Sequence, residues 1–143
     1  MFQLHPRLQA DTCWLGDLPL TRVLLATDSQ YPWLILVPKV AHLREIHHLA
    51  PAQQQQLMQE SCAVAALMEQ ALTPDKINVA ALGNLVPQLH LHHVARFTTD
   101  RAWPGPIWGA HPSVPYDAAH LTEQADIWRS RLGELPGFCI AAG

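Results

Sequence analysis

The sequence lacks the features that mark membrane, secreted and disulfide-rich proteins. It has no run of about 18 or more apolar residues, so we expect no transmembrane helix. Its first residues, MFQLHP, do not have the pattern of a signal peptide. The three cysteines, Cys13, Cys62 and Cys139, are odd in number and far apart, which indicates reduced thiols. We therefore expect a cytoplasmic protein that does not bind membranes.

Charge is also sparse. Charged residues make up 15% of the chain, and 9 Lys and Arg against 12 Asp and Glu give a net charge of -3. No block of like charge occurs, so nothing predicts binding to nucleic acid, although a nucleotide-sized ligand needs only a local site. The 143 residues, 49% of them apolar, suit one globular domain that spans residues 1–143.

The hydrophobic pattern predicts an α+β domain. The expected strands cover residues 12–17, 21–27, 33–38, 76–82 and 86–96. The expected helices are a long one at 51–72 and a C-terminal one at 117–132, with a short helical turn within 42–49. Hairpin-length turns favour a mostly antiparallel five-stranded sheet, with the long helix packed on it. The strand at 33–38 is apolar throughout, so we expect both of its faces to be buried.

The long helix has one apolar stripe. Leu57, Val64, Leu67 and Met68 recur at helical spacing, and the pattern also places Cys62 in the core. The polar residues Gln53–Gln56, Gln59 and Glu60 are expected to face water.

The stretch from Gln88 to Arg96 has the most distinctive pattern in the chain. On a strand, side chains alternate between faces, so Gln88, His90 and His92 would share one face. Leu89 and Leu91 would then point into the core. One rigid element would thus present three nitrogen-bearing side chains in a row.

Such a row suits phosphoryl chemistry. A neutral imidazole can attack phosphorus to give a phosphohistidine, provided that nearby donors stabilise the non-bridging oxygens. Two other interpretations stay open. The histidines can be polar residues on a solvated sheet face, or His90 and His92 can be two ligands of a metal ion. A third ligand would have to come from His42, His47, His48 or an acidic residue, and none lies at a diagnostic spacing.

The row and its surroundings resemble the histidine triad (HIT) family. The family signature is His-φ-His-φ-His-φ-φ, where φ is apolar, and Gln88–Val94 (QLHLHHV) is similar to it. Trp33–His42 resembles the family's strand that ends in Pro-Lys and is followed by a His. Asn78 stands where the family has an Asn, and Gly83–Val86 resembles its Gly-Gln-Ser-Val segment. Trp103–Gly105 resembles the C-terminal stretch of one branch.

The resemblance implies a homodimeric nucleotide-binding protein that hydrolyses or transfers nucleoside phosphates at a P–N or P–O bond. It implies no metal and no cofactor, and a small-molecule nucleotide ligand, with purines favoured. By this resemblance His90 is the nucleophile and His92 contacts the phosphate. Asn78 would lie near the ribose and phosphate, and Asn84 would support the phosphate or the leaving group.

Three departures from the family pattern bear on activity. Gln88 replaces the first histidine, and an amide can form hydrogen bonds but does not titrate. Leu85 replaces a Ser that often meets the phosphate. His93 replaces an apolar residue, and we expect it to be an interior histidine. Gln88 is still expected to contact the substrate, but a binding or regulatory protein with little turnover is the alternative to an enzyme.

The resemblance covers about residues 2–108, which we expect to form the core of the domain, followed by a loop and helix at 109–143. Trp103 and Trp108 lie in a loop rich in Pro, Trp and Gly, where they can pack or line a base pocket. Arg96 can pair with a phosphate or form an ordinary salt bridge at the end of the strand.

Overall fold

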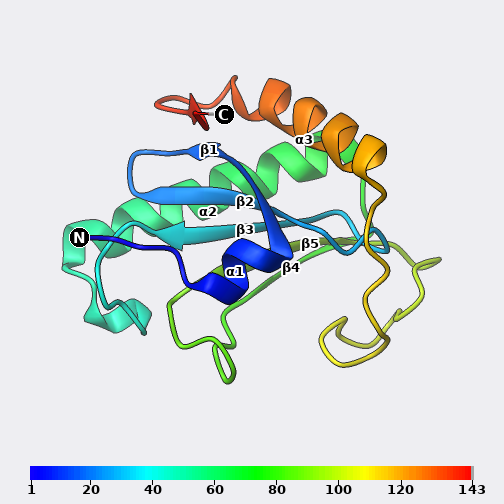
Figure 1. The fold of residues 1–143 in the computed structure, drawn as a ribbon, viewed down its shortest axis with the longest axis horizontal. Coiled ribbons are helices and arrows are strands. Elements are labelled where there is room, and N and C mark those ends of the chain that lie inside the picture. Colours follow the sequence, from blue (N-terminus) through cyan, green and yellow to red (C-terminus); the bar gives the residue numbers. More distant parts are fainter. Residues whose placement is uncertain (143) are drawn as a thin grey trace.

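The fold is a six-stranded antiparallel sheet with helices on both faces, as Figure 1 shows for the computed structural model, which describes residues 1–142. The strand order is β4-β5-β3-β2-β1-β6. The strands are β1 (Thr12–Asp17), β2 (Thr21–Ala26), β3 (Trp33–Pro38), β4 (Lys76–Ala80), β5 (Leu91–Arg96) and β6 (Cys139–Ile140). The helices are α1 (Pro6–Asp11), α2 (Pro51–Leu72), α3 (Ala118–Leu132) and the 3-10 turn η1 (Ile46–His48).

The sheet separates two apolar clusters. In Figure 1, α2 lies behind the strands and α1 lies in front of them. Leu34 and Leu36 of β3 belong to the larger cluster with residues of α2 and α3, whereas Ile35 and Val37 belong to the smaller cluster with Leu8 of α1. Because successive side chains of a strand point to opposite faces, both faces of β3 are covered. This confirms the expectation of a strand that is buried on both sides.

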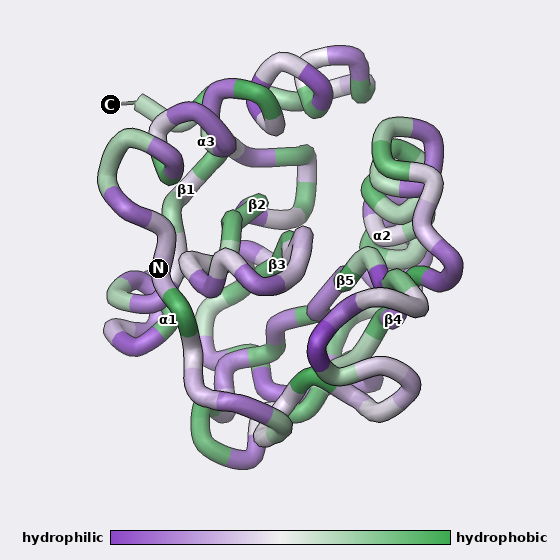
Figure 2. The backbone as a smooth tube through the Cα atoms, turned by 90° about the vertical axis from the view of Figure 1, so that its right-hand side faces the viewer, coloured by the Kyte–Doolittle hydropathy of each residue, from purple (hydrophilic) through white to green (hydrophobic). Residues whose placement is uncertain are grey.

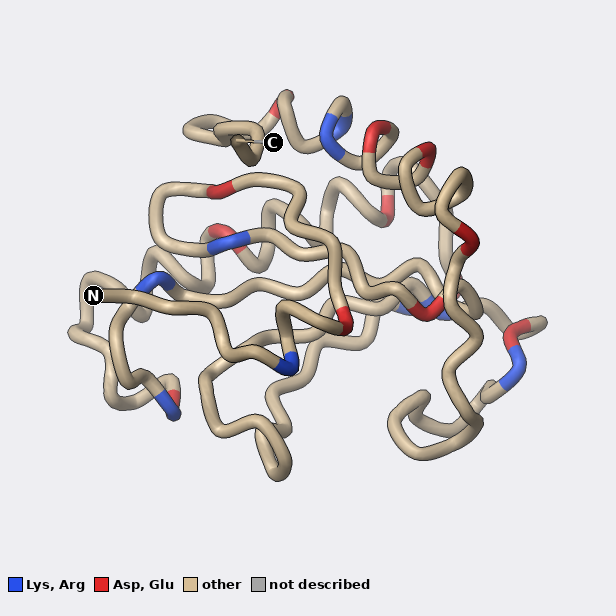
Figure 3. Tube along the Cα trace, in the orientation of Figure 1, with Lys and Arg blue, Asp and Glu red and all other residues tan. Residues whose placement is uncertain are grey.

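Charged and apolar residues are spread without long blocks of either kind. Figure 2 shows hydrophilic and hydrophobic positions mixed over most of the chain, and Figure 3 shows both signs of charge scattered over the fold. Within residues 1–142, no helix combines the length and the hydropathy that a membrane span requires.

The predicted fold class is confirmed, but two details of the strands were wrong. The sheet described here has six strands rather than five, because Cys139 and Ile140 pair with β1. A two-residue strand has no hydrophobic period that could reveal it. The strand predicted at 86–96 begins only at Leu91. Pro87 has no N–H for a strand ladder, and residues 86–90 instead form an irregular approach to β5.

Helix α2 has the predicted bounds, and Leu57, Val64, Leu67 and Met68 are buried as expected. Two other predictions on this helix were wrong. Cys62 is exposed. Glu60 is buried, where its carboxylate accepts hydrogen bonds from the backbone N–H groups of Leu20 and Thr21, each at 2.9 Å. These tertiary donors compensate for the loss of water around the carboxylate, so the polarity of Glu60 misled the prediction.

His93 joins β5 to α2 in the interior. Its Nδ1 lies 3.1 Å from the carbonyl oxygen of Leu91, and its Nε2 lies 2.7 Å from the Ser61 hydroxyl oxygen. A carbonyl can only accept, so Nδ1 carries the proton and Nε2 accepts from the Ser61 hydroxyl. His93 is therefore an interior histidine with both nitrogens satisfied, as the sequence predicted.

We expect Ser61→Ala to destabilise the fold by about 1–3 kcal/mol, because it leaves the Nε2 of His93 buried without a partner. Urea unfolding of the variant and the wild type measures the change. Ser130→Ala is the matched control, since Ser130 is exposed on α3 and its loss should change stability by less than about 0.5 kcal/mol. Equal unfolding midpoints for all three proteins would contradict the role of Ser61.

Candidate active site

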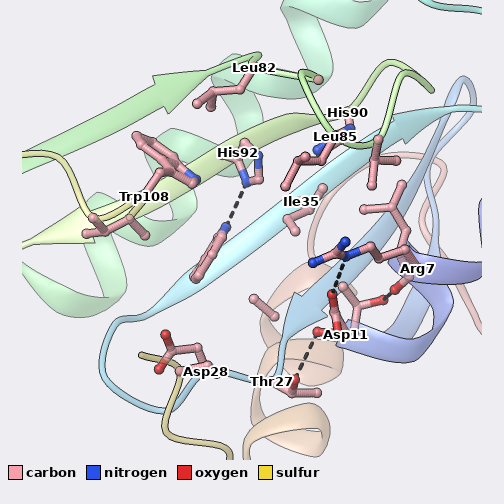
Figure 4. Close-up of a pocket in the computed structure, with 18 of the residues that line it drawn as sticks. Arg7, Asp11, Thr27, Asp28, Ile35, Leu82, Leu85, His90, His92 and Trp108 are labelled. Atoms are coloured by element: carbon pink, nitrogen blue, oxygen red, sulfur yellow. Dashed lines mark hydrogen bonds and ion pairs between the residues drawn. The ribbon is translucent and has the colours of Figure 1, made fainter. Parts of the chain in front are cut away.

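A cavity of about 690 Å³ opens on the face of the sheet that α1 covers. Figure 4 shows His90 and His92 in its wall, with Trp108 at one end and Arg7 of α1 at the other. The rest of the lining comes from β3 and from the segments around residues 82–86 and 107–113. The site is thus built from elements that are far apart in sequence, on a rigid sheet.

His90 is oriented by the backbone just before β5. Its Nδ1 lies 2.7 Å from the carbonyl oxygen of Gln88. Because the carbonyl can only accept, Nδ1 carries the proton and the neutral ring has its lone pair on Nε2. Burial lowers the pKa of His90 below its ordinary value of 6.5, although the bond to the Gln88 carbonyl acts in the opposite direction. His90 is therefore a neutral imidazole with a free nucleophilic nitrogen at pH 7.

His92 is held in the opposite tautomer. Its Nδ1 lies 3.0 Å from the indole Nε1 of Trp33, the bond drawn as a dashed line in Figure 4. An indole N–H can only donate, so Nδ1 accepts and the proton of the neutral ring is on Nε2. Burial, with smaller effects from His90 and His93, lowers the pKa of His92 to about 3. His92 is thus a neutral hydrogen-bond donor.

The two rings form a complementary pair. Their centroids are 4.9 Å apart and their planes meet at 74°. His90 offers a lone pair on Nε2 and His92 offers an N–H on Nε2, so one ring can attack an electrophilic centre while the other donates to an oxygen bound to it. This arrangement matches the needs of nucleophilic attack on a phosphoryl group.

Comparison with known proteins identifies the family of this chain. The HIT domain profile matches residues 7–99. The chain belongs to the histidine triad family. It is 52% identical to a histidine triad protein from Marinobacter aquaeolei VT8, with 92% of this chain and 93% of that chain covered and a TM-score of 0.85. It is 45% identical to a histidine triad protein from Bradyrhizobium japonicum, with 91% of this chain and 97% of that chain covered and a TM-score of 0.87. A search of curated proteins gave no match.

In this histidine triad protein, Gln88 contributes to the site through its backbone. Gln88 supplies the carbonyl that orients His90. Its side chain binds the N-terminal segment instead, where Oε1 accepts from the backbone N–H of His5 and Nε2 donates to the carbonyl of Gln3, both at 2.8 Å. Gln88 is not among the residues that line the cavity. Its side chain is therefore not in the position expected for a substrate contact.

The two asparagines are separated by the fold. Asn84 lines the cavity, as a substrate-binding residue must. The Oδ1 of Asn78 instead accepts a hydrogen bond of 2.8 Å from Nη1 of Arg96. Asn78 pairs with Val94 in the strand ladder, and it is Ala80 that lies opposite His92. Asn78, which was named by its resemblance to the family, is therefore two residues away from the position opposite His92.

Arg96 holds the loop that carries the tryptophans. It is buried and forms a two-pronged salt bridge with Asp100, with N–O distances of 2.8 and 3.0 Å, and it donates to the carbonyl of Gly105 at 2.8 Å. Trp103 stacks on its guanidinium group at 5.7 Å. Of the two interpretations of Arg96, the structure shows the salt bridge.

Trp108 is a lining residue. Its ring centroid is 5.1 Å from that of His92, and its Nε1 is buried without a hydrogen-bond partner among the described residues. The sequence left open whether Trp108 packs or lines a pocket, and the structure places it at the cavity, whereas Trp103 packs on Arg96.

Several other lining residues were missed in the sequence. They include Arg7, Leu8, Asp28, Trp33 and Ile35. The alternation of β3 could have found Trp33 and Ile35, because they share a face of the sheet with His92. No local pattern marks the others, because they reach the cavity through the tertiary fold alone.

Ligands for a metal ion do not gather around the pair. Within residues 1–142, no group of three or more His, Cys, Asp or Glu side chains is placed to hold a metal ion. His42, His47 and His48 are exposed and do not line the cavity.

The buried histidines predict a loss of stability in mild acid. Burial lowers the pKa of His93 to about 4 and that of His92 to about 3, against an ordinary value of 6.5 in the unfolded chain. Between these values the unfolded state binds more protons, so the stability present above pH 6.5 is lost as the pH falls. Each histidine contributes a slope of up to about 1.4 kcal/mol per pH unit. Urea unfolding at pH 7, 5.5 and 4.5 measures this, and a flat profile would refute the buried neutral state.

Proposed function

We propose that this protein hydrolyses or transfers nucleoside phosphates at a P–N or P–O bond through a phosphohistidine at His90. Membership of the histidine triad family supports a nucleotide as the ligand. The observation that carries the proposal is the 2.7 Å bond between Nδ1 of His90 and the Gln88 carbonyl, because it leaves the lone pair on Nε2. The cavity supplies the enclosed site in which this nitrogen meets the substrate.

The proposed reaction has two displacements. In the first, Nε2 of His90 attacks phosphorus, a P–N bond forms, and the bond to the leaving group breaks as that group departs with the electron pair. In the second, water or another acceptor attacks the same phosphorus and releases His90. His92 donates its Nε2 proton in a hydrogen bond to a non-bridging oxygen, which becomes more negative in each transition state.

The glutamine at position 88 is compatible with this reaction. The bond that orients His90 comes from the backbone, which any residue provides. What a glutamine removes is a group that titrates near neutral pH, so the leaving group must take its proton from water or from the substrate itself.

The remaining lining suits a nucleoside. Leu8, Ala26 and Ile35 form an apolar wall of the cavity that can receive a base. Asp28 places a carboxylate at the same cavity, where it can accept hydrogen bonds from ribose hydroxyls. Asn84 can donate to the phosphate or the leaving group. We propose a purine nucleotide as the ligand. The described lining of the cavity has no cluster of basic residues that would bind a polymeric nucleic acid.

We expect His90→Ala to lower turnover of a purine nucleoside phosphoramidate by about a thousandfold or more, because it removes the nucleophile. His92→Ala keeps the nucleophile but removes the donor, and should lower kcat/KM by about 100-fold. Product release, followed by chromatography, measures both. A panel of adenosine and guanosine phosphoramidates, dinucleoside polyphosphates and sugar nucleotides should be used.

His47→Ala is the control, because His47 is exposed on η1 and does not line the cavity. Turnover by His90→Ala at the wild-type rate would refute the mechanism.

A nucleotide-binding protein with little turnover is the second candidate. It is favoured by Leu85, which is 80% exposed at the cavity and offers no side-chain donor to the phosphate. Calorimetry that detects binding without any product would select it.

We also propose that two copies associate along β4. This strand lies at one edge of the described sheet. Val79 on the strand is 49% exposed, and Leu82 just after it is 46% exposed. An unpaired apolar edge favours pairing with another chain. Leu85 is close in sequence and lines the cavity, so a partner at this edge would lie near the site.

We expect Val79→Asp to convert the dimer to a monomer, because it would bury a charge at the interface. Analytical ultracentrifugation reports the change. Ile140→Asp is the matched control, since Ile140 is 65% exposed on β6 at the opposite edge of the sheet. A wild-type protein that sediments as a monomer, or a Val79→Asp dimer, would contradict this arrangement.

A further inference from the structure

His92 lies between two tryptophans, and they contact it differently. The Trp33 ring centroid is 5.5 Å from that of His92, and the Trp108 centroid is 5.1 Å away. Trp33 donates its indole N–H to Nδ1 of His92, whereas the indole N–H of Trp108 has no partner in residues 1–142. We propose that Trp33 is a positioning residue that keeps His92 as a donor to the phosphate by fixing its tautomer; this rests on the proposed function.

The strand ladder fixes this bond. Ile35 of β3 pairs directly with His92 of β5, and Trp33 pairs with Val94. Trp33 therefore lies diagonally across from His92 on the same face of the sheet, which is within reach of an aromatic side chain. Because the two rings stand on hydrogen-bonded neighbouring strands, their geometry does not depend on a flexible loop.

The bond selects one of the three states that an imidazole can adopt. With the proton on Nε2, Nδ1 accepts from the indole. With the proton on Nδ1, or with both nitrogens protonated, two N–H groups would point at each other. Trp33 therefore disfavours both the other tautomer and the charged ring.

Trp33 is the principal polar group that acts on Nδ1 of His92. Ile35 and Ala80 lie opposite His92 on the neighbouring strands, and Trp108 covers it from the loop. The titratable groups that influence it are His90 and His93, which are themselves buried. No carboxylate competes for Nδ1 in the described hydrogen-bond network, so the indole decides which nitrogen carries the proton.

The tautomer matters because it determines what His92 presents to the substrate. In the selected state, Nε2–H donates to a phosphate oxygen as negative charge builds up. In the other tautomer, Nε2 would present a lone pair to the same oxygen and repel it. Trp33 does not contact the reacting atoms in this arrangement, and it acts through His92.

Histidine NMR tests this directly, because the ¹⁵N shifts of the ring distinguish the two nitrogens. In the wild type we expect one His92 state near pH 7, protonated at Nε2. Trp33→Phe keeps an aromatic ring but removes the donor. It should give a mixture of tautomers, raise the pH at which His92 becomes charged, and lower turnover by about threefold to tenfold, as expected for one lost hydrogen bond.

Trp108→Phe is the matched control. This variant also replaces an indole ring next to His92 with a phenyl ring. The N–H that it removes, however, has no partner among the described residues. The tautomer and the titration of His92 should be unchanged in this variant. A general effect of aromatic packing would move the His92 signals in both variants, and that result would overturn the proposal.

An unchanged His92 tautomer and titration in Trp33→Phe would also overturn it. Where Trp33→Phe fails to fold, the wild-type protein still decides the question. A scalar coupling across the hydrogen bond from the Trp33 indole to Nδ1 of His92 supports the proposal, and an Nδ1-protonated His92 refutes it. None of these spectra needs a substrate. A wild-type protein that shows the expected tautomer but no turnover would refute the proposed function. The control of the His92 tautomer by Trp33 would still hold in that case.

Discussion

The antiparallel pairing of β3 with β5 determines what each histidine touches. It places Ile35 beside His92 and Trp33 diagonally across from it, so the indole meets Nδ1 at 3.0 Å. The same alternation places His93 on the other face, where its Nε2 lies 2.7 Å from the hydroxyl oxygen of Ser61 on α2. Adjacent histidines thus line the cavity on one face of the sheet and pack in the core on the other. A shift of one residue in this register would exchange the two roles.

Burial and hydrogen bonds act together on the two cavity histidines. Removal from water favours the neutral form of both rings, and a fixed partner then chooses the tautomer of each. A carbonyl oxygen at His90 leaves a lone pair on Nε2, and an indole N–H at His92 leaves a proton on Nε2. Two residues of the same type thereby acquire opposite hydrogen-bonding roles, each from an uncharged partner. Glutamine at position 88 preserves this arrangement, because its backbone supplies the carbonyl.

The sequence predicted more of the scaffold than of the site. Strand periodicity and the family resemblance identified the α+β fold, the positions of His90 and His92 and the interior place of His93. They did not identify Trp33 as the partner of His92, because the two residues are 59 positions apart and only the strand register unites them. Asn78 shows the reverse case, since its type matched the family while its side chain faces Arg96. Glu60 was misplaced because its buried partners lie on other elements.

The nucleophile can be tested by trapping. Wild-type protein is mixed with a purine nucleoside phosphoramidate, quenched within milliseconds under conditions that preserve phosphoramidate bonds, and digested for mass spectrometry. We predict a nucleotidyl group on the peptide that contains His90, located on that residue by fragmentation and absent from His90→Ala. Product formation with no adduct at any time point, or an adduct on His92 instead, would contradict the assignment of His90 as the attacking group.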